Sequence, residues 1–309
     1  MESGLDLFLL GAGASHGSID CEPGLPPLGS ELYERLLKRR AFHDLVPWGF
    51  VADGRSFEAT LGKLWSEHAD RMIPVLQELA VFFAEFRPRP GNLYIELGRR
   101  IRANASHTVL ASINSEMLLE MSLFGSGVPC HYEGTFPARG ATILKLHGSA
   151  NFLPTVAETS AFDGSLRRAL EREGLAGCNA IQVVSDPSEI LGYIRTTGLP
   201  PLVAAYMPGK PIPFCSAVVR DLWTMWHRAI LSARSLTIIG VDLYGEAPHV
   251  WEPLQALRGT LAYVGSDPSA RDKLAALAPR AARISLAGKT FESYVRPGGP
   301  AASHAQHRW

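Results

Sequence analysis

The chain has few cysteines, and their positions exclude the usual cysteine-based sites. Only four occur in 309 residues, at positions 21, 130, 178 and 215, and no two of them form a CxxC pair. Zinc ribbons and redox-active dithiols need closely spaced cysteines, and a disulfide framework needs a higher density of them. The HExxH pattern of zinc hydrolases is also missing from the sequence. We therefore expect structural or incidental thiols and no metal.

The chain also lacks an excess of charge and a long apolar run. Lys and Arg together number 30, as do Asp and Glu. This balance gives no general attraction to nucleic acid or to anionic lipid. The first residues, MESGLDLFLL, contain no basic segment, and their apolar run is far shorter than the roughly 20 residues of a membrane span. These features predict a cytoplasmic protein without general nucleic-acid or membrane binding.

Hydrophobic residues make up 46% of the chain and charged residues 19%, which is enough for a large core. Several short apolar runs without polar alternation are bounded by turn residues, as is typical of strands covered on both faces. These runs are Leu5–Leu10, Thr108–Ile113, Thr142–Leu146, Ala180–Val184, Ser235–Ile239, Leu261–Val264 and Ala282–Leu286.

Helical patterns lie between these runs, at Ser30–Arg40, Ser56–His68, Arg71–Phe86, Leu93–Ala103 and Ala217–Ala233. Ser30 is the expected N-cap of the first helix. The alternation predicts an α/β fold with a Rossmann-like, doubly wound parallel sheet. We expect one domain over residues 1–296, with helical insertions at about 25–103 and 150–230, and a mobile tail over 297–309.

The first motif is a glycine-rich loop, LLGAGASHG, directly after the first strand. Small residues at this place let the backbone approach a pyrophosphate and offer amide donors to it. A Cβ atom at Gly13 is then expected to intrude on the phosphates. Glycines after a strand also serve as a tight turn, which is the alternative.

Two further motifs end in residues that carry chemistry. In TVLASINSEMLLE a strand ends at Asn114, where open α/β sheets bind ligands, and Glu116 follows. The alternative is that Asn114 caps a helix and that Glu116 favours its N-terminus. In ILKLHGS a strand delivers His147 to its end. A histidine there has the pKa range of a general base, although many such residues are structural.

Two late strands also end in small and acidic residues. LTIIGVDLYGEAPH places Gly240, Asp242 and Glu246 after one strand, and YVGSDP places Ser266 and Asp267 after the next. Acidic groups at such positions bind ribose hydroxyls, but turn formation explains them equally well.

Taken in this order, GAGAS, an Asn before an acid, KLHGS and a late IIG resemble the SIR2-like family. This is the bacterial branch related to sirtuins, many of whose members consume NAD⁺ in anti-phage defence. The likeness runs through nearly all of residues 5–290, with GAGAS and KLHGS as its specific parts.

The resemblance implies that Asn114 holds the ribose and the attacking water and that His147 is the catalytic histidine. It also implies NAD⁺-binding roles for Gly11, Ala12, Gly13, Ser15, Glu116, Gly240, Asp242, Ser266 and Asp267. Family members often have TNYD where this chain has Ile113-Asn114-Ser115-Glu116, and a small hydroxyl residue where it has Asp242.

The function that the resemblance implies is NAD⁺ hydrolysis to nicotinamide and ADP-ribose, with NAD⁺ as substrate and no metal. The main alternative is a non-catalytic sensor of NAD⁺ or ADP-ribose, which the departures at Ser115, Glu116 and Asp242 favour. A protein deacylase or ADP-ribosyltransferase ranks below both, because the zinc module of deacetylating sirtuins is missing. A homo-oligomer or a regulatory protein partner is compatible with each of these functions.

Overall fold

The computed structural model describes residues 4–52, 57–132, 139–155, 180–203, 216–243 and 247–296. Within these ranges, seven strands form one sheet in the order β11-β10-β9-β1-β4-β6-β5, and every neighbouring pair is parallel. The strands are β1 (Leu5–Leu10), β4 (Thr108–Ser112), β5 (Cys130–His131), β6 (Ala141–Lys145), β9 (Ala233–Ile239), β10 (Thr260–Val264) and β11 (Arg283–Gly288). The predicted Rossmann-like α/β class is confirmed.

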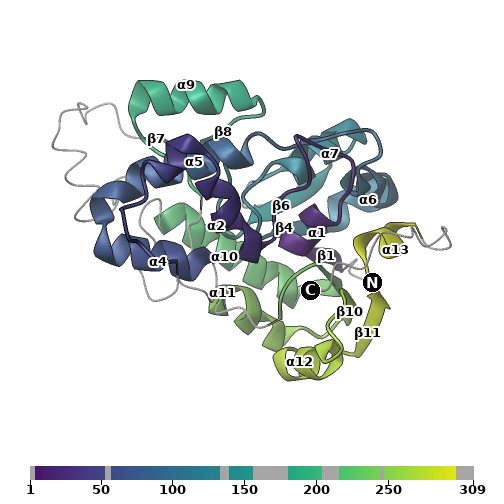
Figure 1. Ribbon diagram of the computed structural model, residues 1–309. Helices are drawn as coiled ribbons and strands as arrows, with labels where there is room; N and C mark the ends of the chain where they lie inside the picture. Colours follow the sequence, from purple (N-terminus) through teal and green to yellow (C-terminus); the bar gives the residue numbers. More distant parts are fainter. Residues whose placement is uncertain are drawn as a thin grey trace.

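The sheet reverses its winding between β1 and β9. From β1 the chain proceeds through β4 to β6 on one side, and from β9 it proceeds through β10 to β11 on the other. Because parallel crossovers are right-handed, the helices of the two halves cover opposite faces. Figure 1 shows α6 (Leu93–Ile101) and α7 (Leu118–Gly125) on one side, and α10 (Ser216–Leu231) and α12 (Ala270–Leu277) on the other. Open α/β sheets bind ligands at the carboxyl ends of the strands beside such a reversal.

The central strands are buried on both faces, as their unbroken apolar runs predict. Every residue of β4 and β6 is buried, and so is all of β1 except Asp6. The prediction is wrong for two outer strands. β11 lies at the sheet edge with Leu286 53% exposed. β8 (Ala180–Val183) is largely exposed and pairs antiparallel with β7 (Phe152–Thr155), outside the main sheet.

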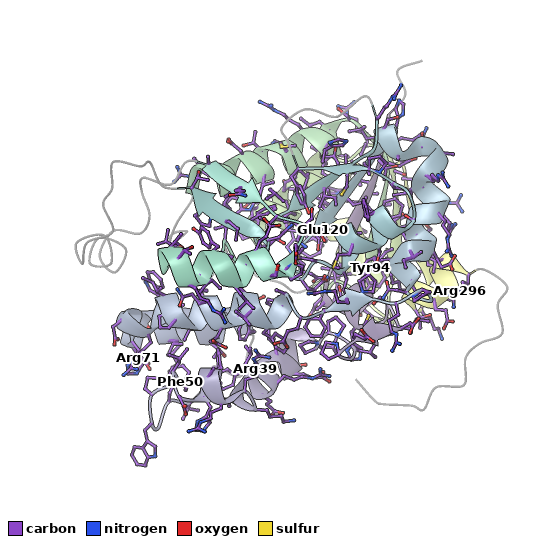
Figure 2. The ribbon with its side chains drawn as sticks, turned by 90° about the horizontal axis from the view of Figure 1, so that it is seen from above. Arg39, Phe50, Arg71, Tyr94, Glu120 and Arg296 are labelled. Atoms are coloured by element: carbon purple, nitrogen blue, oxygen red, sulfur yellow. The ribbon has the colours of Figure 1, made fainter. Side chains whose placement is uncertain are left out.

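Most of the chain between β1 and β4 is helical. It contains α1 (Ala12–His16), α2 (Gly29–Leu37), α3 (Arg40–His43), α4 (Phe57–Glu67), η1 (Ala69–Arg71), α5 (Met72–Phe83), α6 and η2 (Arg102–His107). The short antiparallel strands β2 (Cys21–Glu22) and β3 (Arg87–Pro88) pair the chain before α2 with the chain after α5. Figure 2 shows Arg39 and Phe50 in the outer part of this layer, whereas Tyr94 of α6 lies close to the sheet.

Helix α2 begins one residue earlier than the sequence suggests, at Gly29. Leu28, and not Ser30, is the N-cap of α2, and the N–H groups of Glu31 and Leu32 donate to the Leu28 carbonyl. Ser30 is exposed inside the first turn. Leu28 is the last extended residue before the helix. Its backbone carbonyl, and no side chain, caps the helix.

The remaining described helices are α9 (Pro187–Thr197), α11 (Pro248–Trp251), η3 (Glu252–Ala256) and α13 (Phe291–Val295). α9 contacts α5, and α10 contacts β1, β6 and β9. Much of the expected insertion at 150–230 and all of the expected tail at 297–309 lie outside the described residues, as do Cys178 and Cys215. None of the described helices is long and apolar enough to span a bilayer.

Candidate functional site

The predicted site residues follow the carboxyl ends of five neighbouring strands. Along the sheet edge from β10 to β6 they are Asp267, Gly240, Gly11, Asn114 and His147. Neighbouring strands lie about 4.8 Å apart, so these four steps span roughly 19 Å. The site residues therefore form an extended row along this edge of the sheet, and the glycine loop lies at the centre of the row.

The glycine loop packs against the end of β9. The Gly11 N–H donates to the Ile239 carbonyl at 3.1 Å, and the Gly13 N–H donates to the Gly240 carbonyl at 2.9 Å. A Cβ atom on Gly13 would lie 2.9 Å from the Gly240 Cα. The expectation that this Cβ would meet a phosphate is therefore wrong, because it would point into Gly240. The amides of both glycines are likewise used inside the protein.

Asn114 ties the end of β4 to the glycine loop. Its side-chain Nδ2 donates to the Gly11 carbonyl at 2.8 Å and to Ser15 Oγ at 2.8 Å. Asn114 is not the helix cap, since α7 begins at Leu118 with Met117 at its N-cap, whereas Glu116 does contact the N-terminus of this helix through the Leu118 N–H. Both Nδ2 hydrogens are committed, so the Oδ1 atom is the group that Asn114 can offer to a ligand.

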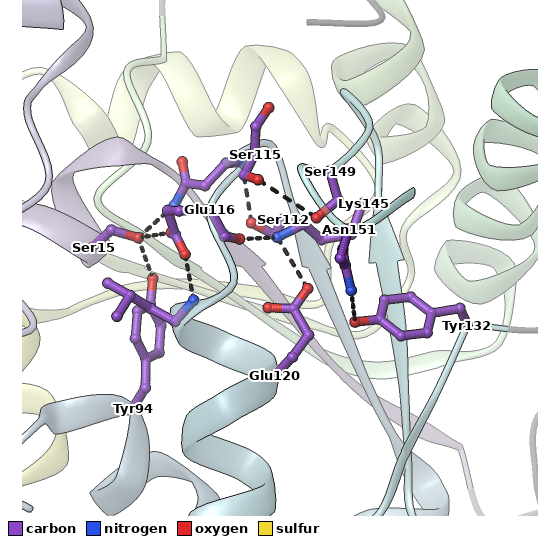
Figure 3. Close-up of polar contacts among 12 residues, drawn as sticks. Ser15, Tyr94, Ser112, Ser115, Glu116, Glu120, Tyr132, Lys145, Ser149 and Asn151 are labelled. Carbon is purple, nitrogen blue, oxygen red and sulfur yellow. Dashed lines mark hydrogen bonds and ion pairs between the residues drawn. The ribbon is translucent and has the colours of Figure 1, made fainter. Parts of the chain in front are cut away.

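Ser15 is the junction of this network, and Figure 3 shows it between Tyr94 and Glu116. The Tyr94 hydroxyl lies 2.9 Å from Ser15 Oγ, and Ser15 donates to Glu116 Oε1 in a short hydrogen bond. A serine hydroxyl has one hydrogen and two lone pairs. With Glu116 ionised, Ser15 donates to Glu116 and accepts from Asn114 and Tyr94, so no capacity remains for a phosphate.

Glu116 is 3% exposed and both of its oxygens are occupied. Oε1 accepts from Ser15, and Oε2 accepts from the Leu118 N–H at 2.6 Å. Burial raises the pKa of Glu116, whereas Lys145 and these hydrogen bonds oppose the rise. Burial, followed by the charge of Glu116, also raises the pKa of Tyr94, which therefore stays a hydrogen-bond donor.

A buried ion pair lies beneath this network. Lys145 at the end of β6 is fully buried, and its Nζ lies 3.1 Å from Glu120 Oε1 and donates to the Glu116 carbonyl at 2.6 Å. Figure 3 shows Glu120 rising from α7 toward Lys145. Buried charges are costly unless paired, so Lys145 links β6 to the β4–α7 loop.

His147 lies at the end of β6, 8% exposed. Its Nε2 atom is 3.1 Å from Nε2 of His249, which belongs to α11. Burial lowers the pKa of His147 to about 3, and the neighbouring His249 adds to the shift. Burial also lowers the pKa of His249, to about 4. Both imidazoles are therefore neutral at pH 7, and the value for His147 lies well below the range expected from the sequence.

A pocket of about 110 Å³ brings the central residues of the site together. Ala12, Ser15, Asn114, Glu116 and His147 form its wall on the sheet side. The opposite wall comes from the helical layer between β1 and β4, and consists of Pro26, Pro27, Gly29, Leu32, Phe57, Glu58, Leu79 and Phe83. Ile113 and Ser115 complete the lining. The lining residues from the strand ends are mostly polar, whereas those from the helical layer are apolar except for Glu58.

The other predicted residues lie along the edge outside this pocket. Asp242 is exposed after the Gly240 turn, and Ser266 is exposed after β10. Asp267 accepts from the Ser269 N–H at 2.9 Å and pairs with Lys273 at 2.5 Å, and the Lys273 bond is the first cause of its pKa of about 2. Its carboxylate thus also orders the turn before α12. Glu246 lies outside the described residues.

Sequence reasoning assigned no role to Tyr94, Lys145, Glu120 or His249. Tyr94 sits in an amphipathic helical stretch, where nothing in the spacing marks it as a site residue. Glu120, Lys145 and His249 fall inside the TVLASINSEMLLE, ILKLHGS and LTIIGVDLYGEAPH motifs, so their place in those motifs is the signal that could have found them. Among the described residues, no group of three His, Cys, Asp or Glu side chains is arranged to hold a metal ion.

The chain matches no known family model and no curated protein sequence. It is similar to solved structures of Sir2 proteins. One is a mutant Sir2 homologue in complex with ADP-ribose, 16% identical over 95% of this chain and 92% of that chain, with a TM-score of 0.49. Another is Sir2 with a deacetylated p53 peptide and 3′-O-acetyl ADP-ribose, 14% identical over 96% of this chain and 92% of that chain, with a TM-score of 0.46.

Proposed function

We propose that this protein binds NAD⁺ and hydrolyses it to nicotinamide and ADP-ribose. The observation that carries the proposal is that Asn114 and His147 line one pocket with Ala12 and Ser15 of the glycine loop. The three contributing strands are neighbours in the sheet, and the pocket lies at their carboxyl ends. Such an edge is where open α/β sheets bind nucleotides.

The length of the edge suits an extended dinucleotide. We place the nicotinamide ribose in the pocket between Asn114 and His147, the pyrophosphate beside the Gly11–Gly13 turn, and the adenosine ribose near Ser266 and Asp267. A pocket of about 110 Å³ holds only part of such a ligand. The rest must extend along the sheet edge toward β10, past Gly240 and Asp242.

The chemistry asks the protein for positioning more than for a nucleophile. Nicotinamide leaves with the electron pair of its bond to the ribose, and one water then supplies the hydroxyl group. Asn114 Oδ1 can accept a hydrogen bond from that water or from a ribose hydroxyl, and His147 can accept the proton. The apolar cover formed by Leu32, Phe57 and Leu79 would exclude other water.

A role in anti-phage defence is part of the proposal, and it rests on the sequence resemblance. An NAD⁺ hydrolase must be kept inactive in a healthy cell. A homo-oligomer, the helical insertion at about 25–103 and a regulatory protein partner are the three candidates for that control.

A sensor that binds NAD⁺ or ADP-ribose without cleaving it is the second candidate. The low pKa of His147, about 3, favours it, because a general base works best when its pKa lies near the working pH. In the sensor, Asn114 and the glycine loop keep their binding roles, and His147 only shapes the pocket.

The deciding experiment incubates the purified full-length chain with NAD⁺ and measures nicotinamide release, with and without an acetylated peptide. Affinity for NAD⁺ and for ADP-ribose is measured on the same preparation. Peptide-independent release supports the hydrolase, and binding without release supports the sensor. Release that requires the peptide supports a deacylase. If neither ligand binds, the whole proposal is wrong.

A further inference from the structure

Two histidines meet at the end of β6. His147 belongs to the pocket, and His249 reaches it from α11 on the other half of the sheet. Their Nε2 atoms are 3.1 Å apart, and their ring centroids are 5.1 Å apart with the planes inclined by 52°. This distance is that of a hydrogen bond between the two rings.

Two tryptophans of helix α10 contact His249 and the backbone beside both histidines. Trp223 stacks on the His249 ring with centroids 4.0 Å apart and planes inclined by 21°. The Trp223 Nε1–H donates at 2.9 Å to the carbonyl of Leu146, the residue before His147. The Trp226 Nε1–H donates at 3.0 Å to the carbonyl of Val250, the residue after His249.

The two tryptophans do more than pack against apolar neighbours, because both indole N–H groups donate hydrogen bonds. Each indole fixes the backbone beside one histidine, and Trp223 also fixes the plane of the second imidazole. Trp223 and Trp226 lie three residues apart, so they share one face of α10. A single helix, α10, therefore fixes the position of each histidine relative to the other.

Only one hydrogen can lie between the two Nε2 atoms when both rings are neutral. If His249 donates it, the Nε2 lone pair of His147 is used and its Nδ1 carries a hydrogen, so His147 has no lone pair left to act as a base. If His147 donates it, Nδ1 of His147 keeps a lone pair. The second arrangement is the one that base chemistry needs.

We propose that His249 is a positioning residue for His147: it accepts the hydrogen bond from Nε2–H and so holds His147 in the tautomer whose Nδ1 is basic. The catalytic part of this inference rests on the proposed NAD⁺ hydrolysis. The tautomer itself is a property of the protein without ligand.

In the reaction, water gives one proton to Nδ1 of His147 while its oxygen bonds to the ribose carbon that nicotinamide leaves. The His147 imidazolium then donates its Nε2–H to His249 in a charge-assisted hydrogen bond. The proton later passes to solvent, so the products are nicotinamide, ADP-ribose and H⁺.

Two substitutions separate this role from simple packing. His249→Phe keeps a flat ring to stack on Trp223 but cannot accept the hydrogen bond. His249→Gln replaces the ring by an amide whose oxygen can accept it. His227→Gln, on the exposed side of α10, is the matched control.

The first readout is the tautomer of His147 at pH 7.5 without NAD⁺, from long-range ¹H–¹⁵N spectra of protein labelled at histidine. The His147 signals are assigned as those lost in His147→Asn. We expect the Nε2–H form in wild type, His249→Gln and the control, and a mixture or the Nδ1–H form in His249→Phe. An Nδ1–H form in wild type, or no change in His249→Phe, overturns the proposal.

The second readout is steady-state nicotinamide release. We expect His249→Phe to lower kcat by about tenfold or more with KM changed by less than about threefold, and His249→Gln to recover most of kcat. Equal losses in both variants would indicate packing alone and overturn the role. If wild type releases no nicotinamide, the proposed function fails while the tautomer result still decides whether His249 positions His147.

Discussion

The Tyr94 hydroxyl lies 2.9 Å from Ser15 Oγ and joins helix α6 to the glycine loop, although the two residues are 79 positions apart in the sequence. Tyr94 is 1% exposed, and its ring packs edge-on against Phe291 at 5.2 Å. Buried hydroxyls that lose a partner cost more than the hydrogen bond contributes. The glycine loop is therefore held in place by a residue outside the sheet.

The Ser15–Tyr94 pair is expected to be energetically coupled. Ser15→Ala leaves Tyr94, Asn114 and Glu116 each short of a partner, and should lower the free energy of unfolding by about 1–3 kcal/mol. Tyr94→Phe should lower it by about 1 kcal/mol, and by less in the Ser15→Ala background. Urea denaturation of the four proteins measures the coupling. Tyr33→Phe, whose hydroxyl makes no hydrogen bond within the described residues, is the control, and strict additivity would contradict the network.

Gly240 is expected to be indispensable for folding rather than for ligand contact. Its φ is +61°, and a Cβ there would lie 2.1 Å from the Ala14 nitrogen. Strain and overlap together should cost Gly240→Ala about 2 kcal/mol or more of stability. Gly24→Ala, where an added Cβ meets nothing within 4 Å, should change stability by less than about 0.5 kcal/mol. Similar melting temperatures for the two variants would show that the loops are not packed this closely.

Asn114 and His147 are expected to leave different kinetic signatures. His147→Ala should lower the rate of NAD⁺ cleavage by roughly 10²-fold or more with little change in affinity, because it removes a base and few ground-state contacts. Asn114→Ala should lower the rate and also weaken binding by about 1 kcal/mol.

The control for this pair is Asn104→Ala at the opposite end of the sheet, where Asn104 Nδ2 donates to Asp6 Oδ2 at 2.8 Å. It should lower thermal stability without changing NAD⁺ affinity. Nicotinamide release, affinity and melting temperature are measured on the same preparations. Wild-type cleavage rates in both His147→Ala and Asn114→Ala would mean that the assigned site is wrong.

The histidine pair predicts a loss of stability in mild acid. The folded pKa values of His147 and His249, about 3 and about 4, lie below the unfolded value of 6.5, so the unfolded chain binds protons first as the pH falls. Their stabilising contribution is present above pH 6.5 and is lost as the pH falls toward the folded values. For His147 alone the loss between pH 6.5 and pH 5 is about 2 kcal/mol.

Glu116 has the opposite pH dependence. Because its pKa is raised in the folded state, it stabilises the folded protein at low pH, and this contribution to stability is lost as the pH rises. Unfolding free energies at pH 7.5, 6 and 5 test the balance. His147→Asn should show a shallower decline than wild type, whereas the exposed His227→Gln should follow wild type. A stability that rises between pH 7.5 and pH 5 would contradict the burial of the pair.

The sequence by itself determined the central strands. The apolar runs at β1, β4 and β9 end within two residues of their predicted bounds, because a strand covered on both faces is mostly apolar and is bounded by turn residues. For the same reason the sequence placed Asn114 and His147 at strand ends. The exposed β8 shows the limit, since a short apolar run does not state which strand it will pair with.

Only the tertiary structure decided what these residues contact. Ser15 and Glu116 are 101 positions apart, and His147 and His249 are 102 apart. Each pair meets because the strand order brings distant loops to one edge, and no local periodicity encodes that order. The same holds for Gly13: its sequence neighbours explain a turn, but only the end of β9 explains why a Cβ atom has no room there.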